Sequence, residues 1–281
     1  MKTYLDCIPC FFNQIIRTGR LLHMDEAVIM DMLGEFGASV RDFRMDVPPP
    51  RTAVALYDMI ARHTGSDDPF RQIKEESTRT ALSFYPELRQ QVKESASPLG
   101  TAIKFAIAAN IIDFGVSAEF DMEKEIKKVL DPSSFGLWEE DALIEAIGRA
   151  KWILYLGDNT GETVFDRLLM ETMDRPVTYA VREGPIINDA TIEDARAAGI
   201  DRVARVISSG CRAPGTILEL CSEEFLRLFR SAPLIISKGQ GNYETLSGTE
   251  APIFYLLKAK CKVVAGHLGV NVGELIITAR G

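Results

Sequence analysis

The chain has 281 residues, of which 46% are hydrophobic and 26% charged, the composition of a globular protein large enough for two domains. No apolar run approaches the roughly 20 residues that span a bilayer, and the first residues lack the pattern of a signal peptide, so we expect a cytoplasmic protein without membrane contacts. The net charge of −8 argues against a broad nucleic-acid-binding surface, which would be basic.

The first half of the chain is predicted to be helical, because apolar residues recur at helical spacing between turn signals. Residues 46–51 contain three consecutive prolines and are expected to be extended or to form a turn. Pro86 is expected to begin a new helix rather than to continue the preceding one. The predicted helices cover residues 10–22, 26–40, 52–62, 69–84, 86–95 and 101–115.

The last of these helices is apolar on nearly all sides, which is typical of a buried helix. Asn110 and Asp113 are three residues apart and therefore share one of its faces. A buried amide or carboxylate is costly unless it is paired. These two side chains therefore either cap a neighbouring loop or line an active site.

From residue 151 onward, short strand-like runs alternate with helical patterns, after a charged stretch that includes a loop at 131–134. This alternation predicts an α/β fold, a three-layer αβα sandwich with a mainly parallel, Rossmann-like sheet. We therefore divide the chain into a mainly helical region, 1–148, and an α/β domain, 149–281. The predicted strands are 152–156, 177–181, 203–207, 234–237, 254–257 and 275–278, and the predicted helices are 162–173, 191–198, 216–220, 223–230 and 243–246.

Polar residues follow four of the predicted strands. Because the carboxyl ends of parallel strands share one edge of a sheet, these loops are expected to converge on one crevice. Each loop alone could be a turn or a helix cap, but four in succession favour a functional site. The residues are Asp158, Asn159 and Glu162 after the first strand, Asn188 and Asp189 after the second, Ser209 after the third, and Lys238, Gly239, Gly241 and Asn242 after the fourth.

The residue types at these strand ends indicate a metal and a phosphate. Asp158, Asn159 and Asp189 could supply three oxygen ligands to a divalent cation, and Lys238, beside glycines, suits a phosphate group. Glu162 could orient a water molecule. In the alternative interpretation, Asp189 caps the following helix and Glu162 is solvated in a first helical turn.

Five cysteines form an odd set, and only Cys7 and Cys10 are close in sequence. A single CxxC supplies half of a zinc site, so this pair could bind a second metal with a distant ligand, act as a redox couple, or be two buried thiols. No dinucleotide-binding fingerprint, Walker A motif or HExxH motif is present.

Several motifs together resemble the damage-control phosphatase family, long catalogued as a domain of unknown function. The CxxC motif is similar to that of its compact prokaryotic and archaeal branch. The resemblance covers nearly the whole chain and rests on Cys7-Ile-Pro-Cys10, Asn110-Ile-Ile-Asp113-Phe-Gly115, Gly157-Asp-Asn-Thr-Gly-Glu162, Asn188-Asp189 and Ser237-Lys-Gly-Gln-Gly-Asn-Tyr-Glu244.

The resemblance implies a helical N-terminal region packed on the sandwich and a phosphatase site between them. Asp158, Asn159 and Asp189 would hold Mg²⁺, Mn²⁺, Ni²⁺ or Co²⁺, and Lys238 would bind the phosphate. The ion would activate water, although Asp158 could instead attack phosphorus directly. The substrate is expected to be a small phosphorylated metabolite, contacted by Asn110, Asp113, Glu162, Asn188, Ser209, Gly239, Gly241 and Asn242.

Two other functions remain open from the sequence. A family member has been described as a carboxyl methyltransferase that uses S-adenosylmethionine (SAM), but the first strand end here lacks a glycine-rich SAM loop. The second alternative is a non-catalytic protein that binds a metal or metabolite, with Asp158 and Asn159 capping a helix. The sequence leaves the oligomeric state open, a homodimer being one option.

Overall fold

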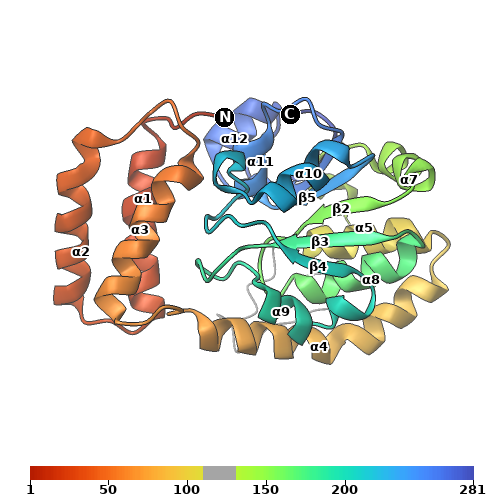
Figure 1. Ribbon diagram of the computed structural model, residues 1–281, viewed down its shortest axis with the longest axis horizontal. Coiled ribbons are helices and arrows are strands. Elements are labelled where there is room, and N and C mark those ends of the chain that lie inside the picture. Colours follow the sequence, from red (N-terminus) through yellow and green to blue (C-terminus); the bar gives the residue numbers. More distant parts are fainter. Residues whose placement is uncertain (110–130) are drawn as a thin grey trace.

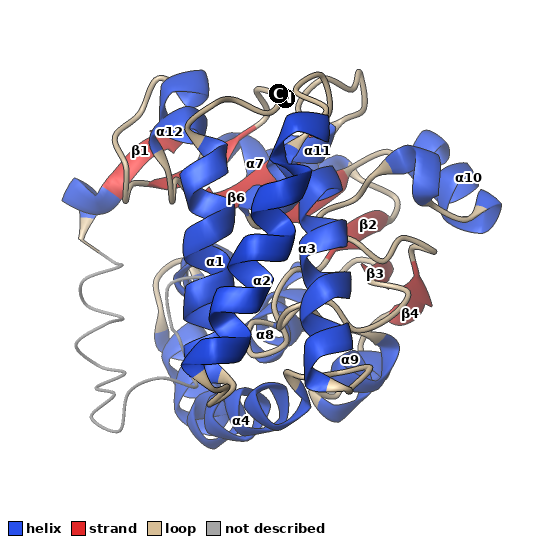
Figure 2. Cartoon of the chain, turned by 90° about the vertical axis from the view of Figure 1, so that its left-hand side faces the viewer, coloured by secondary structure: helices blue, strands red, loops and turns tan. Residues whose placement is uncertain are grey.

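The structure is a computed structural model that describes residues 1–109 and 131–281. Its first three helices lie side by side at one end of the molecule (Figures 1 and 2). Helices α1 (Cys7–Leu21), α2 (Glu26–Ser39) and α3 (Pro49–Thr64) supply most of one hydrophobic cluster, which includes Phe11, Met32 and Leu56. The three helices therefore form a small bundle beside the rest of the chain.

A seven-stranded sheet forms the centre of the remaining structure, in the order β1-β7-β6-β5-β2-β3-β4. All neighbouring strands are parallel except β6 and β7, so β7 and its partner β1 run opposite to the other five. The strands are β1 (Phe135–Trp138), β2 (Ile153–Leu156), β3 (Val177–Val181), β4 (Arg205–Ser208), β5 (Ile235–Lys238), β6 (Ile253–Lys258) and β7 (Leu275–Thr278).

Helices cover both faces of the sheet. In β2, Ile153 and Tyr155 face one hydrophobic cluster while Leu154 and Leu156 face the other, as the twofold repeat of a strand requires. The first cluster contains α4 (Arg71–Glu94), α5 (Pro98–Ala108), α7 (Glu140–Arg149), α8 (Thr163–Met173) and α9 (Ile192–Ala197); the second contains α10 (Glu223–Ser231), α11 (Gln240–Leu246) and α12 (Lys262–Leu268). The predicted three-layer α/β fold with its mainly parallel sheet is confirmed.

Helices from the first half of the chain contribute to this sandwich. Both α4 and α5 pack against the sheet cluster, and β1 is one of its edge strands. Most of the residues in the α1–α3 cluster come from those three helices, but Phe70 and Ile186 also belong to it. The division at residue 148 stays a prediction. The described residues also contain four short 3-10 segments: Val40–Asp42, Pro132–Ser134, Ile200–Arg202 and Leu218–Leu220.

Several predicted boundaries were wrong, and packing explains most of them. A single helix, α4, replaces the two predicted around Pro86, because Ala81, Leu88 and Val92 on both sides of the proline enter one hydrophobic cluster. That burial offsets the roughly 3 kcal/mol cost of an internal proline. Helix α3 begins inside the proline run, where a first turn tolerates proline.

Three elements of the described residues were missed: β1, α7 and α12. Strand β1 has only four residues, all partly exposed, and so lacks a buried apolar run, while α12 has seven residues and offers little helical periodicity. Helix α7 lies in the charged stretch before residue 151, to which no helix was assigned. Asn110 and Asp113 lie outside the described residues. Within the described ranges, no helix is both long and apolar enough to cross a membrane.

Candidate active site

The loops after β2 and β3 are joined by backbone hydrogen bonds. Ala190 N donates to Asp158 O at 2.8 Å, and Thr160 N donates to Asn188 O at 2.8 Å. Between these bonds, Asn159 and Asp189 form an isolated antiparallel bridge. The structure thus brings together the three residues that the sequence predicts as metal ligands.

The loop after β5 closes against Asp158. Gly239 has a φ of +80°, in the left-handed region that favours glycine, and a Cβ there would overlap Asp158 Oδ2. Gly241 is equally restricted, because its Cβ would overlap the Pro214 carbonyl oxygen. Both glycines are therefore required by the packing of the protein itself, and a contact with substrate stays a prediction.

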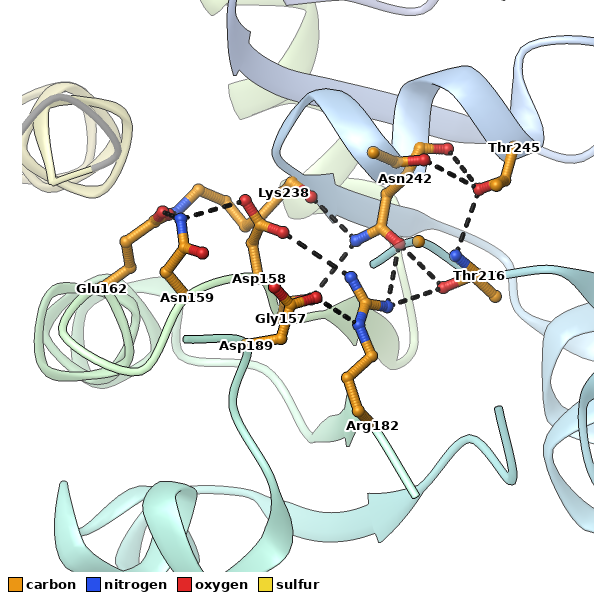
Figure 3. Close-up of polar contacts among 12 residues, drawn as sticks. Gly157, Asp158, Asn159, Glu162, Arg182, Asp189, Thr216, Lys238, Asn242 and Thr245 are labelled. Atoms are coloured by element: carbon orange, nitrogen blue, oxygen red, sulfur yellow. Dashed lines mark hydrogen bonds and ion pairs between the residues drawn. The ribbon is translucent and has the colours of Figure 1, made fainter. Parts of the chain in front are cut away.

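Arg182, which no sequence motif marked, lies between the side chains of Asp158 and Asp189. Its Nε donates to Asp189 Oδ2 at 2.7 Å, and its Nη2 lies 3.6 Å from Asp158 Oδ1 (Figure 3). The guanidinium is buried. An arginine directly after a buried strand, next to predicted carboxylate ligands, was the available sequence signal, since buried carboxylates need a counter-ion.

The two aspartates are held in an environment that disfavours their charge. Burial, followed by the charges of Asp189 and Glu162, raises the pKa of Asp158 to about 8, while the charge of Arg182 opposes the rise. Burial likewise raises the pKa of Asp189, although the Arg182 guanidinium opposes the rise. Both carboxyl groups therefore hold their protons more tightly than an exposed aspartate does.

Lys238 is fully buried and paired with two carboxylates. Its Nζ donates to Glu162 Oε2 and to Asp166 Oδ1, both at 2.9 Å, and these carboxylates raise its pKa against the effect of burial. Tyr155 and Tyr179 also donate hydroxyl hydrogen bonds to Asp166, at 2.6 and 2.8 Å. In this structure Lys238 joins β5 to α8, and its predicted role in binding phosphate stays a prediction.

Two alternative interpretations of the acidic residues do not hold. Glu162 is buried rather than solvated, and besides Lys238 it accepts a 2.6 Å hydrogen bond from Asn159 Nδ2. Thr191, not Asp189, occupies the N-cap of α9, where Asp194 accepts its backbone N–H at 2.9 Å. Both acids are therefore part of the cluster at the strand ends.

Three further predicted residues have contacts within the protein. Asn242 Nδ2 donates to the carbonyl oxygens of Gly157 at 3.2 Å and Lys238 at 2.8 Å, which ties the ends of β2 and β5 together. Ser209 Oγ accepts the Cys211 backbone N–H at 3.2 Å. Asn188 contributes the carbonyl that pairs with Thr160. A role of these side chains in substrate binding stays a prediction.

Lys260, which no sequence motif marked, is an exposed cation at the carboxyl edge of the sheet. It follows β6, which runs parallel beside β5, and its backbone N donates to Gln240 Oε1 at 2.8 Å. Its charge opposes the raised pKa values of Asp158, Asp189 and Glu244, so its ammonium lies near the acidic cluster. Among the described residues, Lys260 is therefore suited to bind an incoming anion.

The helical bundle reaches the site through α1 and α3. Tyr57 of α3 is buried, and this burial raises the pKa of its hydroxyl group. The charges of Asp189 and Cys10 raise the same pKa, so both groups lie near Tyr57.

The two cysteines of the CxxC motif differ in exposure. Cys7 is buried and Cys10 is exposed, and burial raises the pKa of both thiols, with Cys261 nearby. Across residues 1–109 and 131–281, no three His, Cys, Asp or Glu side chains are arranged to hold a metal, so a second metal at the CxxC motif has no third ligand there.

The fold and the cluster place charged and polar side chains at the carboxyl edge of a parallel sheet, where ligands bind in open α/β folds. The family model for the damage-control phosphatase ARMT1-like domain matches residues 3–276. This protein therefore belongs to the damage-control phosphatase family, as its motifs predicted.

Archaeal relatives match along their whole length. The chain is 36% identical to damage-control phosphatase PH1575 of Pyrococcus horikoshii, over 98% of this chain and 97% of the relative. It is 33% identical to a damage-control phosphatase of Archaeoglobus fulgidus, over 98% of both. The crystal structure of PH1575, a DUF89 family protein, superimposes with a TM-score of 0.89 at 34% identity and covers 99% of each chain. The resemblance is thus confirmed in both sequence and fold.

Proposed function

We propose that this protein is a divalent-metal-dependent phosphatase that hydrolyses phosphomonoesters of small metabolites. The charge of the buried site carries the proposal. When all of them are ionised, four buried carboxylates face two buried cations, which leaves two negative charges without a buried counter-ion, and a divalent cation would balance them. The carboxylates belong to Asp158, Glu162, Asp166 and Asp189, and the cations to Arg182 and Lys238.

The donor set fits a hard divalent ion such as Mg²⁺, Mn²⁺, Ni²⁺ or Co²⁺. Asp158 and Asp189 offer carboxylate oxygens, and the carbonyl oxygen of Asn159 remains available because its amide nitrogen contacts Glu162 and Asp158. When bound, such an ion supplies Lewis-acid polarisation of the phosphate and a more acidic water. Water and substrate oxygens would complete the coordination beyond these three ligands.

The phosphate would be bound by Lys260 at the open side of the site. Lys238 already has two charged partners inside the protein, Glu162 and Asp166, and offsets one of their two negative charges. Lys260 is exposed and lies near both ligand aspartates, so its ammonium can approach a phosphate oxygen without breaking an existing pair. Lys238 would then act on the phosphate only at longer range.

The substrate would be a damaged or surplus phosphorylated metabolite. Sugar phosphates, phosphopantetheine derivatives and nucleotide-related monoesters are the classes to compare. The acidic net charge agrees with a small substrate rather than with nucleic acid. The names of the archaeal relatives support the phosphatase activity, whereas the choice of substrate rests on the family resemblance alone.

A metal-dependent phosphatase assay tests the proposal. We expect purified protein to hydrolyse p-nitrophenyl phosphate with Mg²⁺, Mn²⁺, Ni²⁺ or Co²⁺ and to lose that activity in EDTA. Asp158→Asn should abolish it, while Asp201→Asn, at an exposed position of a 3-10 segment, should retain it. Activity that survives both EDTA and Asp158→Asn would refute the proposal. A panel of phosphorylated metabolites then ranks the substrates.

The two alternatives give different results in the same preparations. A methyltransferase would bind SAM tightly in isothermal titration calorimetry without added metal. A non-catalytic binding protein would bind a divalent cation or a phosphorylated metabolite with no release of inorganic phosphate. The phosphatase proposal predicts phosphate release and no SAM binding.

A further inference from the structure

Arg182 connects the two predicted carboxylate ligands through one rigid group. Three of its atoms face three different directions (Figure 3). Nε donates to Asp189 at 2.7 Å, Nη2 faces Asp158 at 3.6 Å, and Nη1 donates to Asn242 Oδ1 at 3.0 Å and Thr216 Oγ1 at 3.3 Å. A planar guanidinium with donors in fixed directions thereby relates the positions of both carboxylates.

The side chains that hold Arg182 are themselves fixed. Thr216 Oγ1 donates to Asn242 Oδ1 at 2.8 Å, and Asn242 is anchored to the backbone of Gly157 and Lys238. All of these side chains are buried. The guanidinium is thus attached to the ends of β2 and β5 as well as to β3, from which it projects.

The backbone of Arg182 also closes the loop that carries Asp189. Arg182 N donates to Ala190 O at 3.0 Å, and Ala190 N donates to Asp158 O at 2.8 Å. The same residue therefore links the two ligand loops through its backbone and its side chain. Among the described residues Nη2 has no hydrogen-bond partner, and it interacts with Asp158 as an ion pair at 3.6 Å.

We propose that Arg182 is a positioning residue, which holds Asp158 and Asp189 at ligand spacing before a divalent cation binds, and which Asn242 and Thr216 hold in place. This inference rests on the proposed function. Two carboxylates brought together without a cation repel each other, and the positive charge of Arg182 offsets that repulsion. Arg182 itself touches neither the ion nor the substrate.

Arg182→Lys separates the geometry of the guanidinium from its charge. The lysine retains the positive charge but loses the planar fork. We expect the affinity for Mn²⁺, measured by isothermal titration calorimetry, to fall by about 10- to 100-fold, as for other groups that orient metal ligands. At saturating Mn²⁺, the KM for p-nitrophenyl phosphate should remain close to wild type, and kcat should recover in part from its loss at limiting Mn²⁺. The control Arg202→Lys, at an exposed position, should bind Mn²⁺ as wild type does.

A second variant covers the case in which Arg182→Lys does not fold, as judged by circular dichroism. Thr216→Val removes one acceptor of Nη1 and should weaken Mn²⁺ binding by about threefold, the size of one hydrogen bond. Wild-type affinity in Arg182→Lys, or in Thr216→Val where the first variant is unfolded, overturns the inference. So does an increased KM with unchanged Mn²⁺ affinity, which would indicate a substrate contact. If the wild-type protein binds no Mn²⁺, both the proposed function and this inference fail. If the wild-type protein binds Mn²⁺ and the variants bind it with the same affinity, only this inference fails.

Discussion

Lys238 Nζ donates a 2.9 Å hydrogen bond to Glu162 Oε2, and neither side chain is more than 2% exposed. The same ammonium donates to Asp166, so one buried cation serves two carboxylates. Because Lys238 ends β5 and Glu162 precedes α8, this ion pair fixes the start of that helix against the sheet. The lysine that sequence motifs assign to the substrate is therefore also a structural residue.

Replacing this lysine should destabilise the fold. Lys238→Met leaves two buried carboxylates without their cation, which costs about 3–5 kcal/mol when one partner of a buried pair is removed. Urea unfolding at pH 7 measures the change in the free energy of unfolding. The matched control is Lys262→Met on the exposed side of α12, expected within about 0.5 kcal/mol of wild type. Equal stability of the two variants would show that the buried pair contributes little.

Lys260 should affect substrate binding and not stability. Loss of a charge-assisted contact with phosphate costs about 1.5–3 kcal/mol, so Lys260→Ala is expected to raise KM for p-nitrophenyl phosphate by about tenfold or more. Steady-state kinetics at saturating metal measure the effect, with Lys262→Ala as the nearby exposed control. Metal affinity should be unchanged. A KM equal to that of the control would assign the phosphate to other groups.

The metal-free protein should lose stability as pH rises. The folded-state pKa of Asp158, about 8, lies above its ordinary value of 3.8, so folding favours the protonated carboxyl. The resulting stability is complete below about pH 4 and is lost as pH rises through about 8. Urea unfolding in EDTA should therefore show a steeper decline between pH 5 and pH 8 in wild type than in Asp158→Asn. Parallel pH profiles would contradict the raised pKa, and added Mn²⁺ should restore wild-type stability at pH 8.

The sequence predicted the sheet and the convergence of Asp158 with Asp189 because both depend on local patterns. Asp158 and Asp189 each follow a short buried run, and parallel strands bring such positions to one edge. Arg182 and Lys260 carry no such motif, since their importance comes from contacts with residues distant in sequence. The continuous helix through Pro86 was missed for the same reason, because burial on the sheet outweighs local preference. Lys238 shows that a residue type predicts a charge but not its partner.

Gly239→Ala tests how closely β5 and Asp158 must approach. At a φ of +80° an alanine is strained by about 1–2 kcal/mol, and its Cβ would overlap Asp158 Oδ2, so the carboxylate must move. A displaced ligand should reduce kcat/KM by about 100-fold, far more than the loss of stability suggests. Gly248→Ala is the control, because a Cβ there meets no atom within 4 Å and its φ is ordinary. Phosphatase kinetics and urea unfolding on both variants separate the two effects. If Gly239→Ala loses stability but retains kcat/KM, then the position of Asp158 does not limit the reaction, and the carboxylate cannot be the metal ligand that we propose.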